Sequence, residues 1–293
     1  MYDIEALYEA ETVSHAVELL KEHQEAVIIA GGSDVLIKIR EGKLAGKELV
    51  SIYMLDELRG VVLEDDGTLR IKPLTSFSHI TKNEIIQKYI NVLGEAVDKV
   101  GGPQIRNIGT IGGNTCNGVT SADSASTLHA YDAIMEITGA NGVRQVPIQE
   151  FYISAGKVDL NHDELLTSIL IRKESYDNYF GHYIKYAMRN AMDIATTGCS
   201  ANVKLSQDKK HFVDVRVAYG VAAPCPVRAV SAEAVIKGRA VNVEHIDAFA
   251  KQALNDVNPR TSWRASKELR LQLIEELTRR AISEAVKLAG GEL

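Results

Sequence analysis

The chain has 293 residues, of which 45% are hydrophobic and 25% charged, and its formal net charge is −6. These are globular proportions that exclude a mainly disordered chain, and the length predicts two domains or one large one. No apolar run approaches the ~18 residues that cross a bilayer, and the mild acidity argues against nucleic acid as the main partner. Because residues 1–11 also lack the pattern of a secretory signal, we expect a cytoplasmic protein.

The three cysteines, Cys116, Cys199 and Cys225, are widely spaced. An odd and sparse set suits a reducing cytoplasm rather than a disulfide framework. Because an iron–sulfur cluster normally takes four cysteine ligands, the chain cannot build one alone, and any redox carrier must be organic or lie on a partner. The eight histidines contain no metal-spaced pair such as His-x-x-x-His, so we expect no metal site.

The first third of the chain alternates strands and helices. Thr12 has the spacing of an N-cap for a helix, and an apolar run at 26–30 predicts a buried strand that ends at two glycines. A second strand at 49–53 completes a β–α–β order, which predicts a parallel pair. Residues 61–71 read as a hairpin around Asp65-Asp66-Gly67.

The middle of the chain contains an unusual segment. After a helix at 93–100, residues 101–126 hold six glycines and many small polar residues without an amphipathic period. This predicts a long loop, and loops of that length in compact domains tend to be functional. A further hairpin follows at 134–148, with its turn at Asn141-Gly142.

The last part of the chain changes pattern near residue 165. We predict successive antiparallel strands, then helices at 243–255 and 266–288, with a soft domain boundary near residue 175. Trp263, flanked by arginines, either packs the long helix onto the sheet or contacts another subunit. The predicted strands are 165–171, 183–187, 200–205 and 213–219.

The first candidate site is the segment AGGSD at 30–34, directly after the predicted strand. Two glycines let the backbone approach a ligand, successive N–H groups form an anion nest, and Ser33 can donate to a phosphate oxygen. The alternative is a plain Gly-Gly turn in which Asp34 caps the next helix.

The second candidate is NIGTIGGN at 107–114. Its glycines are expected to expose N–H groups, and Thr110 and Asn114 add side-chain donors for a pyrophosphate. A purely structural loop is the alternative. Neither segment is the dinucleotide fingerprint of a Rossmann fold or a P-loop.

Two further polar residues are ambiguous. Asp123 could bond a ribose or an adenine, or simply cap the following helix. Lys185 could point at a cofactor, or be an ordinary lysine at a sheet edge.

The two glycine segments, AGGSD and TIGGN, lie about eighty residues apart, and together they are more specific than either alone. The chain resembles, over essentially its whole length, the FAD-binding subunits of the molybdenum hydroxylases, the family of xanthine dehydrogenase and carbon monoxide dehydrogenase. CNGVTSADSA at 116–125 is most similar to the FAD subunits of three-subunit bacterial xanthine dehydrogenases. Other segments that carry the resemblance are GPQIRNIGTIGGN, Ala122-Asp123, 185–189 with 193–195, and WRASKELRL at 263–271.

The resemblance implies an α+β fold, with a FAD-binding fold of the vanillyl-alcohol-oxidase (PCMH) type in two α/β subdomains. The FAD-binding domain would span residues 1–175, with subdomains at about 1–56 and 57–175. Residues 176–293 would form a C-terminal domain of the CO dehydrogenase flavoprotein type, with a small antiparallel sheet and helices.

The resemblance also implies the cofactor contacts, position by position. No catalytic side chain and no metal ligand is implied, and Cys116 is expected near the flavin as a packing residue, where relatives often carry an aliphatic one. The implied cofactor-binding residues are Val27, Ile28, Ile29, Ala30, Gly31, Gly32, Ser33, Asp34, Thr110, Ile111, Gly112, Gly113, Asn114, Asp123, Leu166 and Lys185.

The implied function is to carry FAD in a xanthine or hypoxanthine dehydrogenase. The chain would accept electrons from the [2Fe-2S] clusters of a small partner subunit, while a large partner holds the molybdopterin, and it would reduce NAD⁺. Alternatives are another substrate in the same family (an N-heterocycle, an aldehyde or CO), a stand-alone flavin oxidoreductase of this fold, or a non-enzymatic assembly protein.

Overall fold

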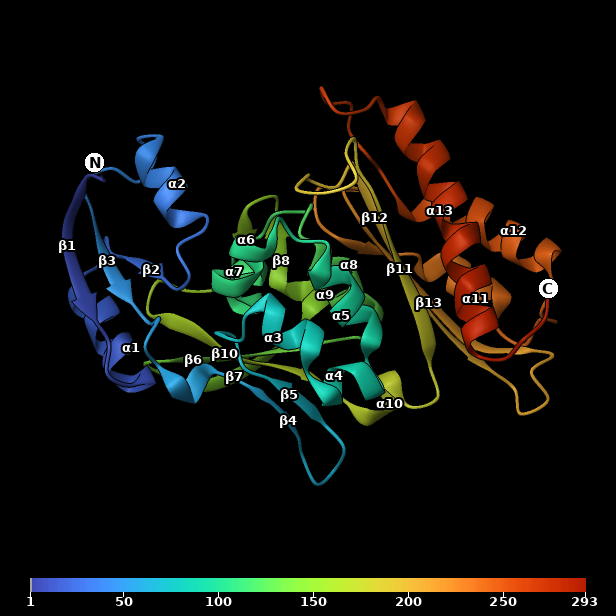
Figure 1. The fold of residues 1–293 in the computed structure, drawn as a ribbon, viewed down its shortest axis with the longest axis horizontal. Helices are drawn as coiled ribbons and strands as arrows, with labels where there is room; N and C mark the ends of the chain where they lie inside the picture. Colours follow the sequence, from blue (N-terminus) through green and yellow to red (C-terminus); the bar gives the residue numbers. More distant parts are fainter. Residues whose placement is uncertain (1) are drawn as a thin grey trace.

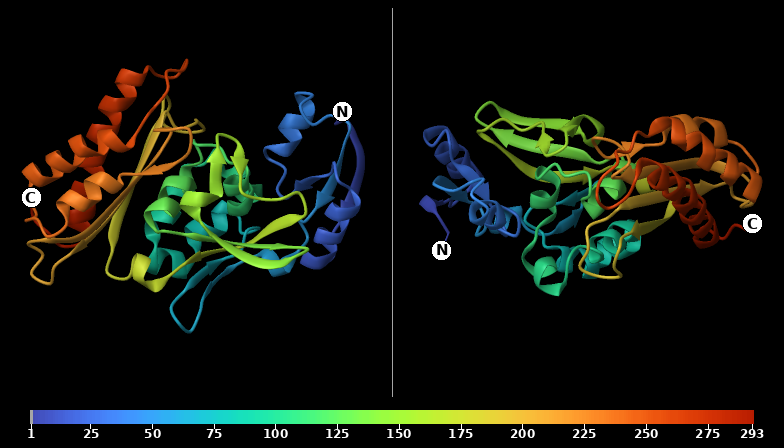
Figure 2. Two further views of the ribbon diagram at one scale, coloured as in Figure 1. Left: turned by 180° about the vertical axis from the view of Figure 1, so that it is seen from behind. Right: turned by 90° about the horizontal axis from the view of Figure 1, so that it is seen from above.

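A computed structural model describes residues 2–293 and shows an elongated molecule in which three β-sheets follow one another along the long axis (Figure 1). The two termini lie at opposite ends, and the view from behind shows the same arrangement (Figure 2). Helices and strands are mixed throughout, as the sequence predicts.

The first sheet is parallel, with strand order β1-β3-β2. Thr12 caps its first helix as predicted, because the Thr12 hydroxyl accepts a hydrogen bond from the backbone N–H of His15 at 3.0 Å. The predicted parallel pair is confirmed as β2 and β3. The additional strand β1 was not predicted, since Leu7 is 55% exposed and disturbs its alternation. The elements of this part are β1 (Ile4–Glu9), α1 (Val13–Glu22), β2 (Val27–Ile29), α2 (Val35–Arg40), β3 (Lys47–Ser51) and the 3-10 helix η1 (Asp56–Leu58).

The second sheet is antiparallel, with strand order β4-β5-β10-β6-β7. Both predicted hairpins are confirmed, as β4–β5 and β6–β7. β10 lies between them and pairs Ile169 with Ile71 on one side and with Met135 on the other. β10 therefore does not continue into the C-terminal series of strands, because its partners come from far earlier in the chain. The strands are β4 (Val61–Leu63), β5 (Leu69–Ile71), β6 (Ile134–Gly139), β7 (Gly142–Pro147) and β10 (Glu164–Ile171).

Helices cover one face of the second sheet and form the central core with it. Figure 1 shows them between the second and third sheets. The helices are α3 (Phe77–Lys82), α4 (Glu84–Tyr89), α5 (Asn91–Asp98), α6 (Pro103–Ile108), α7 (Ile111–Cys116), α8 (Asp123–Ala130), α9 (Ile148–Phe151) and α10 (Lys173–Tyr176). A small hairpin of β8 (Tyr152–Ser154) and β9 (Lys157–Val158) flanks this group.

The expectation of a long loop at 101–126 is wrong. The segment folds into α6, α7 and the start of α8, joined by short turns. Pro103 occupies the first turn of α6, and the Thr110 hydroxyl caps α7 by accepting from the backbone N–H of Gly113 at 3.1 Å. Local capping therefore starts these helices although their small residues show no helical periodicity.

The third sheet is antiparallel, with order β11-β12-β13-β14, and confirms the three remaining predicted strands. It packs α13 on one face and α5 and α8 on the other, which explains why β12 is buried almost throughout. Both predicted C-terminal helices are confirmed, whereas α11 was not predicted. The elements are β11 (Phe180–Tyr186), β12 (Thr197–Leu205), β13 (Phe212–Gly220), β14 (Val227–Arg228), α11 (Val230–Ile236), α12 (Val243–Gln252), the 3-10 helix η2 (Ala253–Asp256) and α13 (Lys267–Leu288).

Trp263 does not pack the long helix onto the sheet, because its side chain is 76% exposed. The guanidinium of Arg264 lies over its ring, 4.2 Å from the centroid. The packing interpretation is therefore wrong, and the subunit-contact interpretation stays a prediction. Among the described residues, none of the helices combines the length and apolar character that a membrane crossing needs.

Candidate functional site

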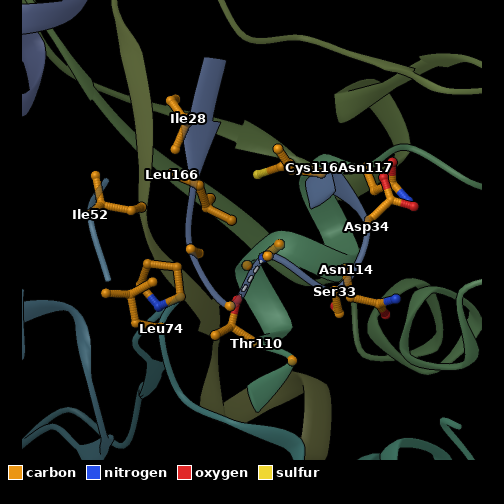
Figure 3. Close-up of a pocket in the computed structure, with 18 of the residues that line it drawn as sticks. Ile28, Ser33, Asp34, Ile52, Leu74, Thr110, Asn114, Cys116, Asn117 and Leu166 are labelled. Carbon is orange, nitrogen blue, oxygen red and sulfur yellow. Dashed lines mark hydrogen bonds between the residues drawn. The ribbon is translucent and has the colours of Figure 1, made fainter. Parts of the chain in front are cut away.

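A cavity of about 530 Å³ opens between the first and second sheets. One wall is the segment that follows β2, the opposite wall is α7, and β10 contributes the base (Figure 3). The two glycine segments that the sequence singles out thus face one cavity, although about eighty residues separate them in the chain.

The first wall lies at the carboxyl end of β2, where open α/β sheets commonly bind ligands. Gly32 has a φ of +71°, which a glycine adopts without strain, and the chain turns there toward α2. Within residues 2–293, no group accepts a hydrogen bond from the backbone N–H groups of residues 31–34. These four donors and the Ser33 hydroxyl are therefore unused within the protein, as the predicted anion nest requires.

The second wall uses its donors differently from the prediction. The backbone N–H of Gly112 donates to the carbonyl of Pro73 at 2.8 Å, and that of Gly113 donates to the Thr110 hydroxyl oxygen. The N–H groups of these glycines are therefore occupied within the protein. The donors that face the cavity are the Thr110 hydroxyl and the Asn114 amide, whose oxygen is fixed by the Ser124 hydroxyl at 2.7 Å.

Two of the glycines allow close backbone packing around the cavity. A Cβ on Gly31 would lie 1.9 Å from the carbonyl oxygen of Ile108, and a Cβ on Gly112 would lie 2.4 Å from Cβ of Pro73. Both distances are far below van der Waals contact. Gly113 differs, because a Cβ there would meet only the Thr110 hydroxyl, at 3.0 Å, and would otherwise point into open space.

The rest of the cavity is apolar. Ile28 and Leu166 project into it from two strands, and Ile52 and Leu74 from two connecting segments (Figure 3). Cys116 lines the same region, and burial raises the pKa of its thiol to about 12. The thiol therefore stays protonated at neutral pH, which supports its expected role in packing.

The cavity carries few charges. Among its lining residues, the described structure places charged side chains only at Asp34, Lys38 and Glu164. Glu164 is paired with Arg144, whose guanidinium donates to both carboxylate oxygens and lowers the pKa of this carboxyl. Asp34 is paired with Lys38 at 2.6 Å. Lys38 and Asn117 were not predicted, because neither belongs to a glycine segment.

Most residues of the predicted site line this cavity. Ile29 and Ile111 do not, and Ile111 is wholly buried in the central core. The predicted residues that line the cavity are Val27, Ile28, Ala30, Gly31, Gly32, Ser33, Asp34, Thr110, Gly112, Gly113, Asn114 and Leu166.

Asp123 and Lys185 lie outside the cavity lining and bind each other. The Lys185 ammonium donates to the Asp123 carboxylate at 2.8 Å and to the carbonyl of Lys99 at 2.9 Å. The Tyr183 hydroxyl donates to the other Asp123 oxygen at 2.7 Å. Burial raises the pKa of Asp123 while Lys185 opposes this shift. Asp123 has no side-chain capping bond to α8, so the cap interpretation is wrong.

Two family models match the chain. They describe the FAD binding domain in molybdopterin dehydrogenase, over residues 2–172, and the CO dehydrogenase flavoprotein C-terminal domain, over residues 182–285.

Known proteins match over the same length. The chain is 44% identical to the xanthine dehydrogenase FAD-binding subunit of Escherichia coli O157:H7, and the match covers 100% of both. It is 28% identical to the glyceraldehyde dehydrogenase medium chain of Sulfolobus acidocaldarius, covering 97% and 99%. The solved carbon monoxide dehydrogenase from Hydrogenophaga pseudoflava has a TM-score of 0.91 and 26% identity, covering 97% of this chain and 98% of that one.

Proposed function

We propose that this chain, which belongs to the family of FAD-binding subunits of molybdenum hydroxylases and is similar to those of xanthine dehydrogenases, holds FAD in the cavity between its first two sheets. The observation that carries the proposal is the pairing of unused donors with an apolar region in one cavity.

The residues present fit this cofactor. FAD combines an anionic pyrophosphate with a flat, largely apolar ring system. The free N–H groups of residues 31–34, with Ser33, Thr110 and Asn114, supply donors for the pyrophosphate. The apolar side chains at Ile28 and Leu166 offer a surface for the rings.

The chain's own task is to bind and orient the cofactor. Its glycine segments hold the pyrophosphate of FAD, and the apolar side chains that line the cavity exclude water from the flavin ring system. Ser124, the residue after Asp123 in α8, fixes the Asn114 amide by a hydrogen bond to its oxygen. Bound FAD supplies the redox chemistry that links single-electron donors to a two-electron acceptor.

The finer assignment concerns partners and substrate. We infer that electrons arrive from [2Fe-2S] clusters on a small partner subunit, that a large partner carries molybdopterin and hydroxylates xanthine or hypoxanthine, and that NAD⁺ is the final acceptor. The support is the full-length similarity at 44% to the E. coli xanthine dehydrogenase subunit, against 28% to the glyceraldehyde dehydrogenase chain. An aldehyde substrate is the second candidate.

Co-expression of the chain with its neighbouring subunits tests this function. We expect a yellow complex that releases FAD on denaturation and reduces NAD⁺ when xanthine is added. A colourless chain that takes up no FAD would contradict the whole proposal. A complex that contains FAD but turns over glyceraldehyde and not xanthine would leave the cofactor assignment intact and reject the substrate.

A further inference from the structure

Lys38 is the one cationic side chain among the cavity-lining residues that the structure describes. It lies in α2, and its side chain is 39% exposed. Its ammonium donates to the side-chain oxygen of Asn117, at the end of α7, at 2.8 Å and lies 2.6 Å from the Asp34 carboxylate. Lys38 thus connects the two cavity walls across 79 residues of sequence.

The two partners fix the position of this ammonium. Asp34 carries both the carboxylate that contacts Lys38 and the last of the four free backbone N–H groups of the nest. The ammonium therefore lies beside the nest, and Figure 3 shows Asp34 and Asn117 on the same side of the cavity. A lysine ammonium has three N–H donors, so two partners leave one donor for a ligand.

The nest alone has no net charge. Backbone N–H groups present dipoles, whereas a pyrophosphate brings full negative charge into a cavity with a largely apolar lining. Arg144 does not line the cavity, and its guanidinium is occupied by Glu164 and Asp159. Lys38 is also paired with a carboxylate, that of Asp34, but it lines the cavity and keeps one N–H donor, so it is the cationic side chain that can bind an anion held by residues 31–34.

We propose that Lys38 binds the pyrophosphate of the cofactor, and that Asp34 and Asn117 act as positioning residues for its ammonium. The inference rests on the proposed function, since it concerns the same cavity. It adds a residue that neither glycine segment contains, and it predicts that affinity for the cofactor depends on this one charge and therefore on salt.

The experiment compares full-length wild-type chain with Lys38→Met and Lys38→Arg, each stripped of cofactor and titrated with FAD at several NaCl concentrations. Lys43→Met is the matched control, because Lys43 also pairs with a carboxylate, that of Glu41 at 2.8 Å, but is 69% exposed and lies outside the cavity. We expect Lys38→Met to bind FAD about ten-fold more weakly at low salt, Lys38→Arg to lie near wild type, and Lys43→Met to be unchanged.

Two further measurements separate charge from structure. The FAD affinity of Lys38→Met should fall less steeply with NaCl than that of the wild type, and riboflavin, which lacks phosphate, should bind both chains equally. Equal FAD affinity in Lys38→Met and wild type would overturn the inference. The inference would also be overturned if Lys38→Met lost FAD affinity by the same factor at every NaCl concentration. It would likewise be overturned if the variant lost as much affinity for riboflavin as for FAD. A wild-type chain that binds no FAD would instead reject the proposed function.

Discussion

At the residue scale, the glycines that line the cavity differ in how much space surrounds them. Gly31 and Gly112 have no room for a side chain, because atoms of Ile108 and of Pro73, respectively, occupy that space. Gly113 lines the cavity, and a Cβ there would meet only the Thr110 hydroxyl. Both kinds of glycine look alike in the sequence, so the sequence brings out the two segments that line the cavity but cannot separate glycines needed for packing from a glycine with free space beside it.

Gly113→Val and Gly31→Val should therefore fail in different ways. Gly113→Val should be destabilised less than Gly31→Val, because its Cβ meets only the Thr110 hydroxyl, and should lose at least about ten-fold in FAD affinity, which is about 1.4 kcal/mol, since Gly113 lines the cavity. Gly31→Val should be destabilised by about 1–3 kcal/mol, because its Cβ overlaps the Ile108 carbonyl. Thermal melting and FAD titration of both variants check this. Normal FAD content in Gly113→Val would contradict the assignment of this wall.

At the element scale, α8 shows why the segment at 101–126 was mispredicted. All eight of its residues are buried, including Asp123, Ser124 and His129. A helix surrounded by protein on all sides does not need an apolar stripe, so periodicity does not reveal it. The hairpins and the long helix α13 were predictable because one face of each meets solvent. β10 was predicted as a strand, but its place between β5 and β6 depends on contacts that no local pattern encodes.

The burial of His129 in α8 makes the stability of the protein sensitive to acid. One ring nitrogen of His129, Nδ1, lies 2.7 Å from the carbonyl oxygen of Ala125, and burial lowers its pKa from 6.5 to about 4. Between these values the unfolded chain binds a proton that the native chain excludes. The contribution of neutral His129 to the free energy of unfolding is therefore complete above about pH 6.5 and is lost as the pH falls toward 4. Between pH 7 and pH 5 the free energy of unfolding should fall by about 2 kcal/mol.

Urea unfolding at these two pH values checks this prediction. His129→Asn, which can keep a donor to Ala125, is the matched variant. Its free energy of unfolding should change less between pH 7 and pH 5 than that of the wild type. An identical pH dependence in both chains would show that His129 does not titrate as its burial requires.

At the scale of the whole molecule, buried polar contacts join α8, in the half that contains the cavity, to the C-terminal sheet. The side chains of Asp123, on α8, and Lys185, on β11, are 6% and 9% exposed, and Tyr183 completes the cluster. The sequence predicts Asp123 and Lys185 as two separate cofactor contacts. Their direct contact could not be predicted, because the two residues lie 62 positions apart on different elements.

Removing one partner of the Asp123–Lys185 ion pair should lower the free energy of unfolding. Asp123→Asn or Lys185→Met leaves an uncompensated buried charge or a broken network, which typically costs about 3–5 kcal/mol. The double variant Asp123→Asn/Lys185→Met should be less destabilised than the sum of the single changes. Chemical unfolding of the four chains measures this coupling energy. Additive losses would mean that the two side chains act independently.

Trp263 gives the protein a built-in optical reporter. It is the only tryptophan of the chain, and its indole stands out into solvent beneath the Arg264 guanidinium. Its emission should be red-shifted, as for an indole in water, and readily quenched by acrylamide. A subunit that covers this surface would shift the emission to the blue and shield it from the quencher, so the assembly of a complex on this side of the chain is measurable without any added label.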